Sequence, residues 1–147
     1  MPALPKLGPV VSDIRAMIQW NSSLETGHVV VDNDHKQLVA QLNRLSEALG
    51  RGAGREEITG IIVFLNSYAR EHFAREEVHM QRVACSAYAE NCRAHAQFLQ
   101  KLATWLERLK STGASTSLVL DVHREACAWI SAHIVGVDCK LRGCRAA

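Results

Sequence analysis

Residues 58–80, ITGIIVFLNSYAREHFAREEVHM, contain the pattern that decides the fold. Apolar side chains recur there at steps of three and four, and a histidine and a glutamate continue the same series. Residues three and four apart lie on one side of an α-helix, so this spacing predicts a single buried stripe. The stripe consists of Ile58, Ile61, Ile62, Leu65, Tyr68, His72, Glu76 and Met80. We therefore predict a long helix from about Glu56 that directs an imidazole and a carboxylate inward.

Three further segments show the same helical period, and each carries one histidine on its apolar stripe. They are the segment from Asp32 with His35, the segment 91–109 with His95, and the segment from about Leu118 to near Gly136 with His133. Glycines at 50, 52 and 54 and the Ser/Thr-rich stretch 111–117 have the composition of loops. Four helices joined by short loops pack as an up-down-up-down antiparallel four-helix bundle, so we predict an all-α fold.

Length and charge limit the class of protein. A chain of 147 residues is enough for one domain with a real core. The first residues are rich in proline and lack a sustained period, which predicts an N-terminal arm over 1–19, anchored near Trp20, and a bundle domain over 20–147. The net charge is only +2 and both signs are interspersed, so we expect no nucleic-acid partner.

The sequence also bears on compartment. No window is long and apolar enough for a membrane span, and prolines break the short apolar stretch at the N-terminus, so we expect neither a signal peptide nor a membrane partner. The five cysteines are odd in number and irregularly placed, which favours reduced thiols over a disulfide framework. We therefore predict a cytoplasmic protein.

Six residue positions together indicate a metal site. A single histidine on an apolar face is more often an ordinary core or surface residue than a ligand. Here, however, inward-facing histidines occur on four predicted helices, and His72 with Glu76 forms an i, i+4 pair that can grip one ion. Burying Glu76 without a compensating cation would cost several kcal/mol. The predicted ligands are His35, His72, Glu76, His95, His133 and Asp138, a set that suits iron, manganese or zinc.

Several motifs resemble those of bacterial hemerythrins. They are Trp20 with Thr26-Gly27, Val31 to Lys36, Tyr68 through His72-Phe73-Ala74-Arg75-Glu76-Glu77 to Met80, and Trp129 through His133-Ile134 to Asp138. The resemblance covers about Trp20 to Lys140. It implies a four-helix bundle that holds two irons joined by an oxo or hydroxo bridge. In that family pattern Glu76 and Asp138 would bridge the irons, while His35 and His72 would hold the iron that leaves a position open for O2.

One position departs from this family pattern. The second iron is expected to take three histidines, but only His95 and His133 match, and the third place falls on Asn91. His79, one turn beyond Glu76 on the same predicted helix, is a candidate replacement ligand, and an exposed or rim position for His79 is an equally good interpretation. His28 is expected at the surface or beside the site, and His123 is too far along its helix to join the centre.

Three functional hypotheses follow. The first is a hemerythrin-like diiron protein that binds O2 reversibly for storage, delivery or sensing, rather than an enzyme. The second is a diiron oxidase, a peroxidase or a nitric-oxide-handling site, opened by the asparagine at position 91. The third is a metal-poor bundle that serves as an interaction domain for an unidentified protein.

Overall fold

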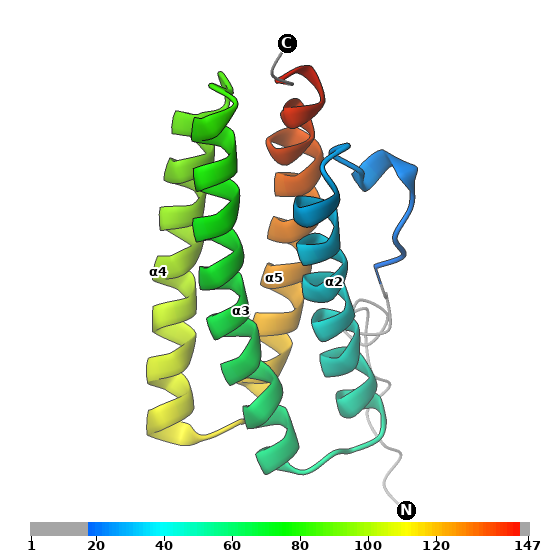
Figure 1. Cartoon of the computed structure of the whole chain (residues 1–147). Helices are drawn as coiled ribbons and strands as arrows, with labels where there is room; N and C mark the ends of the chain where they lie inside the picture. Colours follow the sequence, from blue (N-terminus) through cyan, green and yellow to red (C-terminus); the bar gives the residue numbers. More distant parts are fainter. Residues whose placement is uncertain (1–17, 145–147) are drawn as a thin grey trace, which may run out of the picture.

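The computed structural model describes residues 18–144, which form four long helices and two short 3-10 turns. The elements are η1 (Ser22–Leu24), α2 (Val29–Gly50), α3 (Arg55–Arg82), α4 (Tyr88–Thr112), α5 (Thr116–Gly136) and η2 (Asp138–Gly143). No strand occurs within this part of the chain. Successive helices run in opposite directions along a common axis (Figure 1), and α2 also packs against α5, which closes the bundle. The predicted all-α four-helix bundle is confirmed.

The helix ends follow from local chemistry. Helix α5 starts after Ser115, whose hydroxyl oxygen accepts the backbone N–H of Leu118 at 3.2 Å and so caps the first turn. Helix α4 ends at Thr112, and the next residue, Gly113, has a φ of 70°, which glycine adopts readily. Helix α2 begins at Val29, three residues before the predicted start, and the Asp32 carboxylate in its first turns accepts hydrogen bonds from both the N–H and the hydroxyl of Thr26. These contacts fix the chain direction entering the bundle.

The buried stripes of the four helices meet in one continuous apolar core. Its fully enclosed members include Leu42, Leu45, Leu65, Phe98 and Leu118, one or more from each helix. Because neighbouring helices are antiparallel, the start of α2, the end of α3, the start of α4 and the end of α5 lie at the same end of the bundle (Figure 1). The predicted metal ligands occur in these four stretches, so the fold brings them to one level.

The segment before α2 lies along the bundle. The backbone N–H of Ile18 donates to the Asn43 side-chain oxygen, and the Asn43 amide donates back to the Ile18 carbonyl, both at 3.0 Å. Trp20 packs against the core, and the Lys36 ammonium lies 5.5 Å from its ring centroid. The predicted arm, 1–19, falls outside the described residues except for positions 18 and 19.

Two cysteines correct the prediction that the thiols are reduced. Cys85, in the loop between α3 and α4, forms a disulfide with Cys144, just after η2, with their Cα atoms 5.0 Å apart. The partners are 59 positions apart in sequence, and only the bundle geometry brings them to one end. The thiols of Cys92, Cys127 and Cys139 are free, as predicted.

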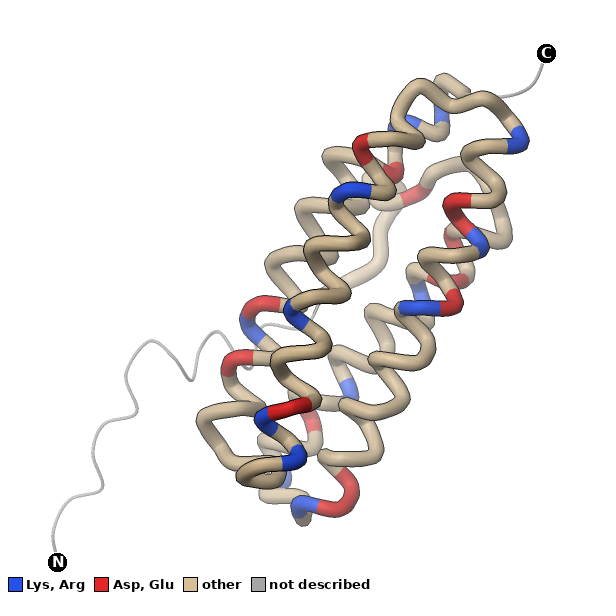
Figure 2. The backbone as a smooth tube through the Cα atoms, turned by 90° about the vertical axis from the view of Figure 1, so that its left-hand side faces the viewer, with Lys and Arg blue, Asp and Glu red and all other residues tan. Residues whose placement is uncertain are grey.

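Two observations concern the predictions that the protein has neither a membrane nor a nucleic-acid partner. None of the helices within residues 18–144 combines the length and apolar character needed to cross a membrane. Positive and negative residues are interspersed along the helices, as Figure 2 shows.

Candidate metal centre

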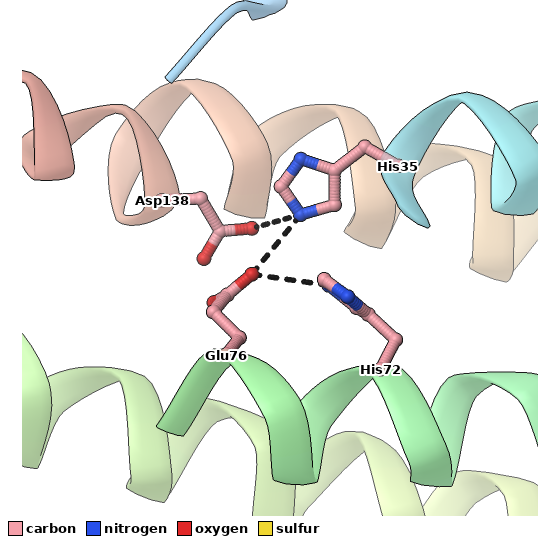
Figure 3. A group of neighbouring side chains, drawn as sticks. All are labelled: His35, His72, Glu76 and Asp138. Carbon is pink, nitrogen blue, oxygen red and sulfur yellow. Dashed lines mark hydrogen bonds and ion pairs between the residues drawn. The ribbon is translucent and has the colours of Figure 1, made fainter. Parts of the chain in front are cut away.

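Four of the predicted ligands meet at one point in the bundle interior. Figure 3 shows His35 from α2, His72 and Glu76 from α3, and Asp138 from η2 pointing toward one another. The Nε2 atom of His35 lies 3.1 Å from Glu76 Oε2 and 3.0 Å from Asp138 Oδ2. The Nε2 atom of His72 lies 3.0 Å from the same Glu76 oxygen. All four side chains are at most 1 % exposed, so the cluster is closed to bulk water.

The other two histidines form a second group on the far side of the same carboxylates. His95 Nε2 lies 3.5 Å from Glu76 Oε1, and His133 Nε2 lies 3.1 Å from Asp138 Oδ1. Each carboxylate therefore turns one oxygen to each histidine pair. This arrangement is suited to two metal ions bridged by Glu76 and Asp138, because a carboxylate can offer one oxygen to each of two cations.

Several of the candidate ligand atoms form no hydrogen bonds with one another, which is the arrangement expected where they bind metal ions. The Nε2 atoms of His72, His95 and His133 and the Oδ1 atom of Asp138 are buried without a hydrogen-bond partner, although carboxylate oxygens or imidazole nitrogens lie nearby. Buried polar atoms are rarely left unsatisfied in folded proteins. Lone pairs that converge on a common space without forming hydrogen bonds are what a metal ion requires.

Two further carboxylates, which the sequence pattern does not single out, contact the Nδ1 atoms of two of these imidazoles. Asp34 Oδ2 lies 3.0 Å from Nδ1 of His72, and Glu77 Oε1 lies 3.1 Å from Nδ1 of His95. When Nδ1 carries the proton, Nε2 is left free to bind a metal, and the carboxylate also fixes the ring direction. The only signal in the sequence is that each acid adjoins a ligand, Asp34 before His35 and Glu77 after Glu76.

Asp34 is itself tightly held. Arg75 donates to both of its oxygens at 2.9 Å, and the Tyr68 hydroxyl donates to Oδ1 at 2.8 Å. Burial opposes ionisation, but the hydrogen bonds from His72, Arg75 and Tyr68 outweigh burial and hold the pKa of Asp34 well below its usual range. Asp34 is therefore a carboxylate at neutral pH, and it can stabilise positive charge that His72 gains on binding a metal.

Replacing Asp34 by asparagine is expected to weaken metal binding about tenfold, because the charge that orients and polarises His72 is lost. The measurement is the rate of metal release to a chelator from the loaded protein. Asp121→Asn is the matched control, since Asp121 pairs only with surface arginines on α4 and α5. Equal release rates for the two variants would show that Asp34 does not support the centre.

The metal-free protein is expected to lose stability in alkaline solution. Burial lowers the pKa of His35, but its hydrogen bonds to Asp138 and Glu76 outweigh burial and raise the pKa to about 9 from 6.5. The resulting stabilisation is complete below pH 6.5 and is lost as the pH rises through about 9. Urea unfolding of the metal-free chain should give a free energy lower by up to about 3 kcal/mol at the alkaline end.

A His35→Gln variant is the control for this pH dependence. Glutamine does not titrate, so the stability of the variant should change less between pH 6.5 and about 9.5. A parent chain whose stability is constant over that interval would contradict the ionised state proposed for His35.

Asn91 lies inside the centre and is fully buried. Its side-chain amide donates to Glu76 Oε1 and to the sulfur of Met80, while its Oδ1 atom has no partner. His79 lies elsewhere, with its Nε2 atom 2.8 Å from Nδ1 of His28, and it joins neither ligand group. The geometry therefore gives no support to His79 as the replacement ligand.

His123 also lies outside the centre, as expected. It is buried on α5, and its Nε2 atom is 3.6 Å from the Cys127 sulfur. Burial lowers the pKa of His123 and raises that of Cys127 to about 11, so both side chains are neutral at neutral pH.

Comparison with known proteins agrees with this geometry. Residues 26–141 match the hemerythrin HHE cation binding domain. The hemerythrin of Themiste dyscrita is 31% identical over 124 residues, covering 84% of this chain and 90% of that protein. The bacteriohemerythrin of Stenotrophomonas maltophilia is 27% identical over 126 residues, covering 84% and 78%.

A bacteriohemerythrin of Pseudomonas aeruginosa (strain LESB58) is 29% identical over 96 residues, which are 65% of this chain and 62% of that protein. The match thus spans about three fifths of the length of this relative. The domain match covers α2 to α5 and every ligand of the two groups. With two carboxylates shared between two histidine pairs at the centre of a four-helix bundle, this chain belongs to the hemerythrin family.

Proposed function

We propose that the protein binds two irons at this centre and binds O2 reversibly there. The observation that carries the proposal is the sharing of Glu76 and Asp138 between two histidine pairs, with one oxygen directed to each pair. Four imidazoles and two carboxylates form a nitrogen-rich set suited to iron. The bacteriohemerythrin and hemerythrin relatives are similar over most of this chain.

The surroundings of the centre suit a small diatomic ligand. A cavity of about 10 Å³ adjoins His35, His72, His133 and Asp138, and its other walls are apolar side chains such as Leu38 and Phe73. That volume is about the space that one water molecule needs. A space of this size would exclude larger molecules. The cavity contacts ligands of both histidine pairs, so it supports binding of a small molecule between them, at the centre itself.

The test is metal content per chain together with the visible spectrum, on protein cycled through dithionite and then oxygen. Two irons per chain and an absorption band that appears with O2 and disappears on its removal would support the proposal. One metal per chain, zinc in place of iron, or irreversible bleaching would overturn it.

A second candidate is a reactive centre that acts as an oxidase, a peroxidase or a nitric-oxide-handling site. Asn91 favours it, because its Oδ1 atom is buried without a partner and the His95 and His133 group contains no third histidine. An open coordination position can accept a substrate or an exchangeable water. Catalytic consumption of peroxide by the iron-loaded protein, without a reversible O2-dependent band, would select this candidate.

The physiological role extends the same proposal. Storage, delivery and sensing all use reversible O2 binding, and sensing would also need a protein partner. A metal-poor interaction domain is the less favoured hypothesis, because it does not explain why unpartnered imidazole nitrogens converge.

A cytoplasmic location stays a prediction, and the disulfide between Cys85 and Cys144 counts against it, because such bonds are rare in reducing compartments.

A further inference from the structure

A surface cavity lies apart from the metal centre, where the start of α2 meets the end of α3. Its volume is about 650 Å³. Sites for small organic molecules typically have volumes of about 300–1,000 Å³. Its walls come from residues 27–31 and from 74–82. None of the six candidate metal ligands lines this cavity, and Arg75, which also holds Asp34, is the one lining residue that reaches the surroundings of the centre.

Three exposed valines form the apolar part of the cavity wall. Val29 is 73 % exposed, Val30 is 64 % exposed and Val78 is 55 % exposed. They belong to the six large apolar side chains that the described residues leave exposed. Covering such a side chain is worth about 1.5–3 kcal/mol when it is fully buried. Valines gathered in a cavity therefore favour an occupant with an apolar portion.

The charged part of the cavity wall is entirely positive. Arg75 and Arg82 line it, and no lining residue is acidic. Within residues 18–144, Arg82 forms no hydrogen bond or ion pair. Arg75 uses Nε and Nη2 to hold Asp34, and its Nη1 atom is left with only the exposed Glu71 at 3.8 Å. Two guanidinium groups with donors to spare favour a carboxylate or similar anion.

The two histidines of the wall, His28 and His79, offer no free facing nitrogen to a cation. His28 Nε2 lies 3.3 Å from the Leu141 carbonyl oxygen, which accepts a hydrogen bond and so places the proton of His28 on Nε2. Nδ1 of His28 then accepts from His79 Nε2–H at 2.8 Å. The facing nitrogens are engaged with each other, and burial, together with the neighbouring His28 and Arg82, lowers the pKa of His79. The histidine pair therefore forms part of the cavity wall, and the two arginines are the groups that can bind an anion.

We propose that this cavity binds an amphipathic carboxylate, such as a medium-chain fatty acid. The acyl chain would cover Val29, Val30 and Val78, and the carboxylate would accept hydrogen bonds from Arg82 and from Nη1 of Arg75. An apolar molecule would leave the guanidinium groups unpartnered, and a small inorganic anion would leave the valines exposed, so one occupant must carry both parts. The proposal is independent of iron and of O2 binding.

Isothermal titration of the full chain with decanoate, below its micellar range, tests the proposal. We expect saturable binding of one decanoate per chain, and much weaker binding of octylammonium, which has an apolar chain with the opposite charge. Acetate should also bind weakly, because it lacks the chain. Arg82→Ala should weaken decanoate binding about tenfold or more, as expected for loss of a charged hydrogen bond.

Two further variants complete the test. Val78→Asn should weaken decanoate binding, and its exposed position makes a folding defect improbable, which circular dichroism checks. Arg93→Ala is the matched control, because Arg93 is exposed on α4 outside the cavity, and it should bind as the parent does. No saturable binding, equal binding of octylammonium, or an equal effect of Arg93→Ala would overturn the proposal. A parent dimer that Val78→Asn converts to a monomer would also overturn it, by assigning the valines to a second copy.

Discussion

Replacing Glu76 by glutamine is expected to remove nearly all iron from the protein. Glu76 is the one α3 carboxylate that reaches both histidine pairs, with Oε2 at 3.1 Å from His35 Nε2 and Oε1 at 3.5 Å from His95 Nε2. Glutamine has nearly the same shape, but it carries no charge, and its amide N–H groups would point toward a cation. The loss of one bridging anion should therefore affect both metals together, since neither histidine pair would keep more than one carboxylate.

The measurement is iron per chain after reconstitution and desalting. Glu71→Gln provides the matched control, because Glu71 is on the same helix with a side chain that is 65% exposed. The parent and Glu71→Gln should hold equal amounts of iron, and circular dichroism should show the same helix content in all three proteins. If Glu76→Gln retained two irons, the assignment of Glu76 as a bridge would be wrong.

Much of the fold was predictable, because helical period survives in the sequence whatever the tertiary contacts are. The stripe from Ile58 to Met80 placed α3 within one residue of its observed start. The predicted start of α2 is three residues late, because His28 forms no side-chain cap that would mark the boundary.

The candidate site was predictable in part for the same reason. The sequence placed six inward-facing side chains, and the structure brings all six together, since residues at matching levels of antiparallel helices meet. The outer carboxylates Asp34 and Glu77 were missed, because their role depends on how the imidazole rings are turned, and that orientation is set by packing. Stacking of Phe73 on His95 and of Trp129 on His133 is part of that packing.

Pairs between distant segments are the contacts that the sequence pattern does not predict. His79 was considered as a ligand because it follows Glu76 by three residues on one helix, yet its ring contacts His28, 51 positions away. Cys85 and Cys144 gave no spacing motif, although the bundle brings them together. Helical period predicts which face of a helix a residue occupies. It does not predict which residue from another segment lies opposite.

Replacing Asn91 by histidine is expected to slow the loss of iron by about tenfold or more, since even partners outside the coordination sphere contribute that much. Asn91 is on α4, one turn before His95, so a histidine there would share its face and could offer a third imidazole to the group of His95 and His133. The Met80 side chain, which contacts Asn91, is flexible enough to accommodate the larger ring. The oxygenated protein should also oxidise more slowly, because a filled position excludes water and other small molecules.

Iron release to a chelator and the rate of autoxidation are the two measurements for Asn91→His. Asn91→Leu is the matched control, because leucine is close to asparagine in shape but offers no ligand atom, and it should not slow iron loss. If histidine and leucine gave the same release and autoxidation rates as the parent, position 91 would not face an open coordination site. If only histidine slowed both processes, the buried and unpartnered Oδ1 atom of Asn91 would mark the place where this centre lacks a ligand. The reactive candidate function depends on that open position, so the same variant should also suppress any catalytic consumption of peroxide while leaving O2 binding beside His35 and His72 intact.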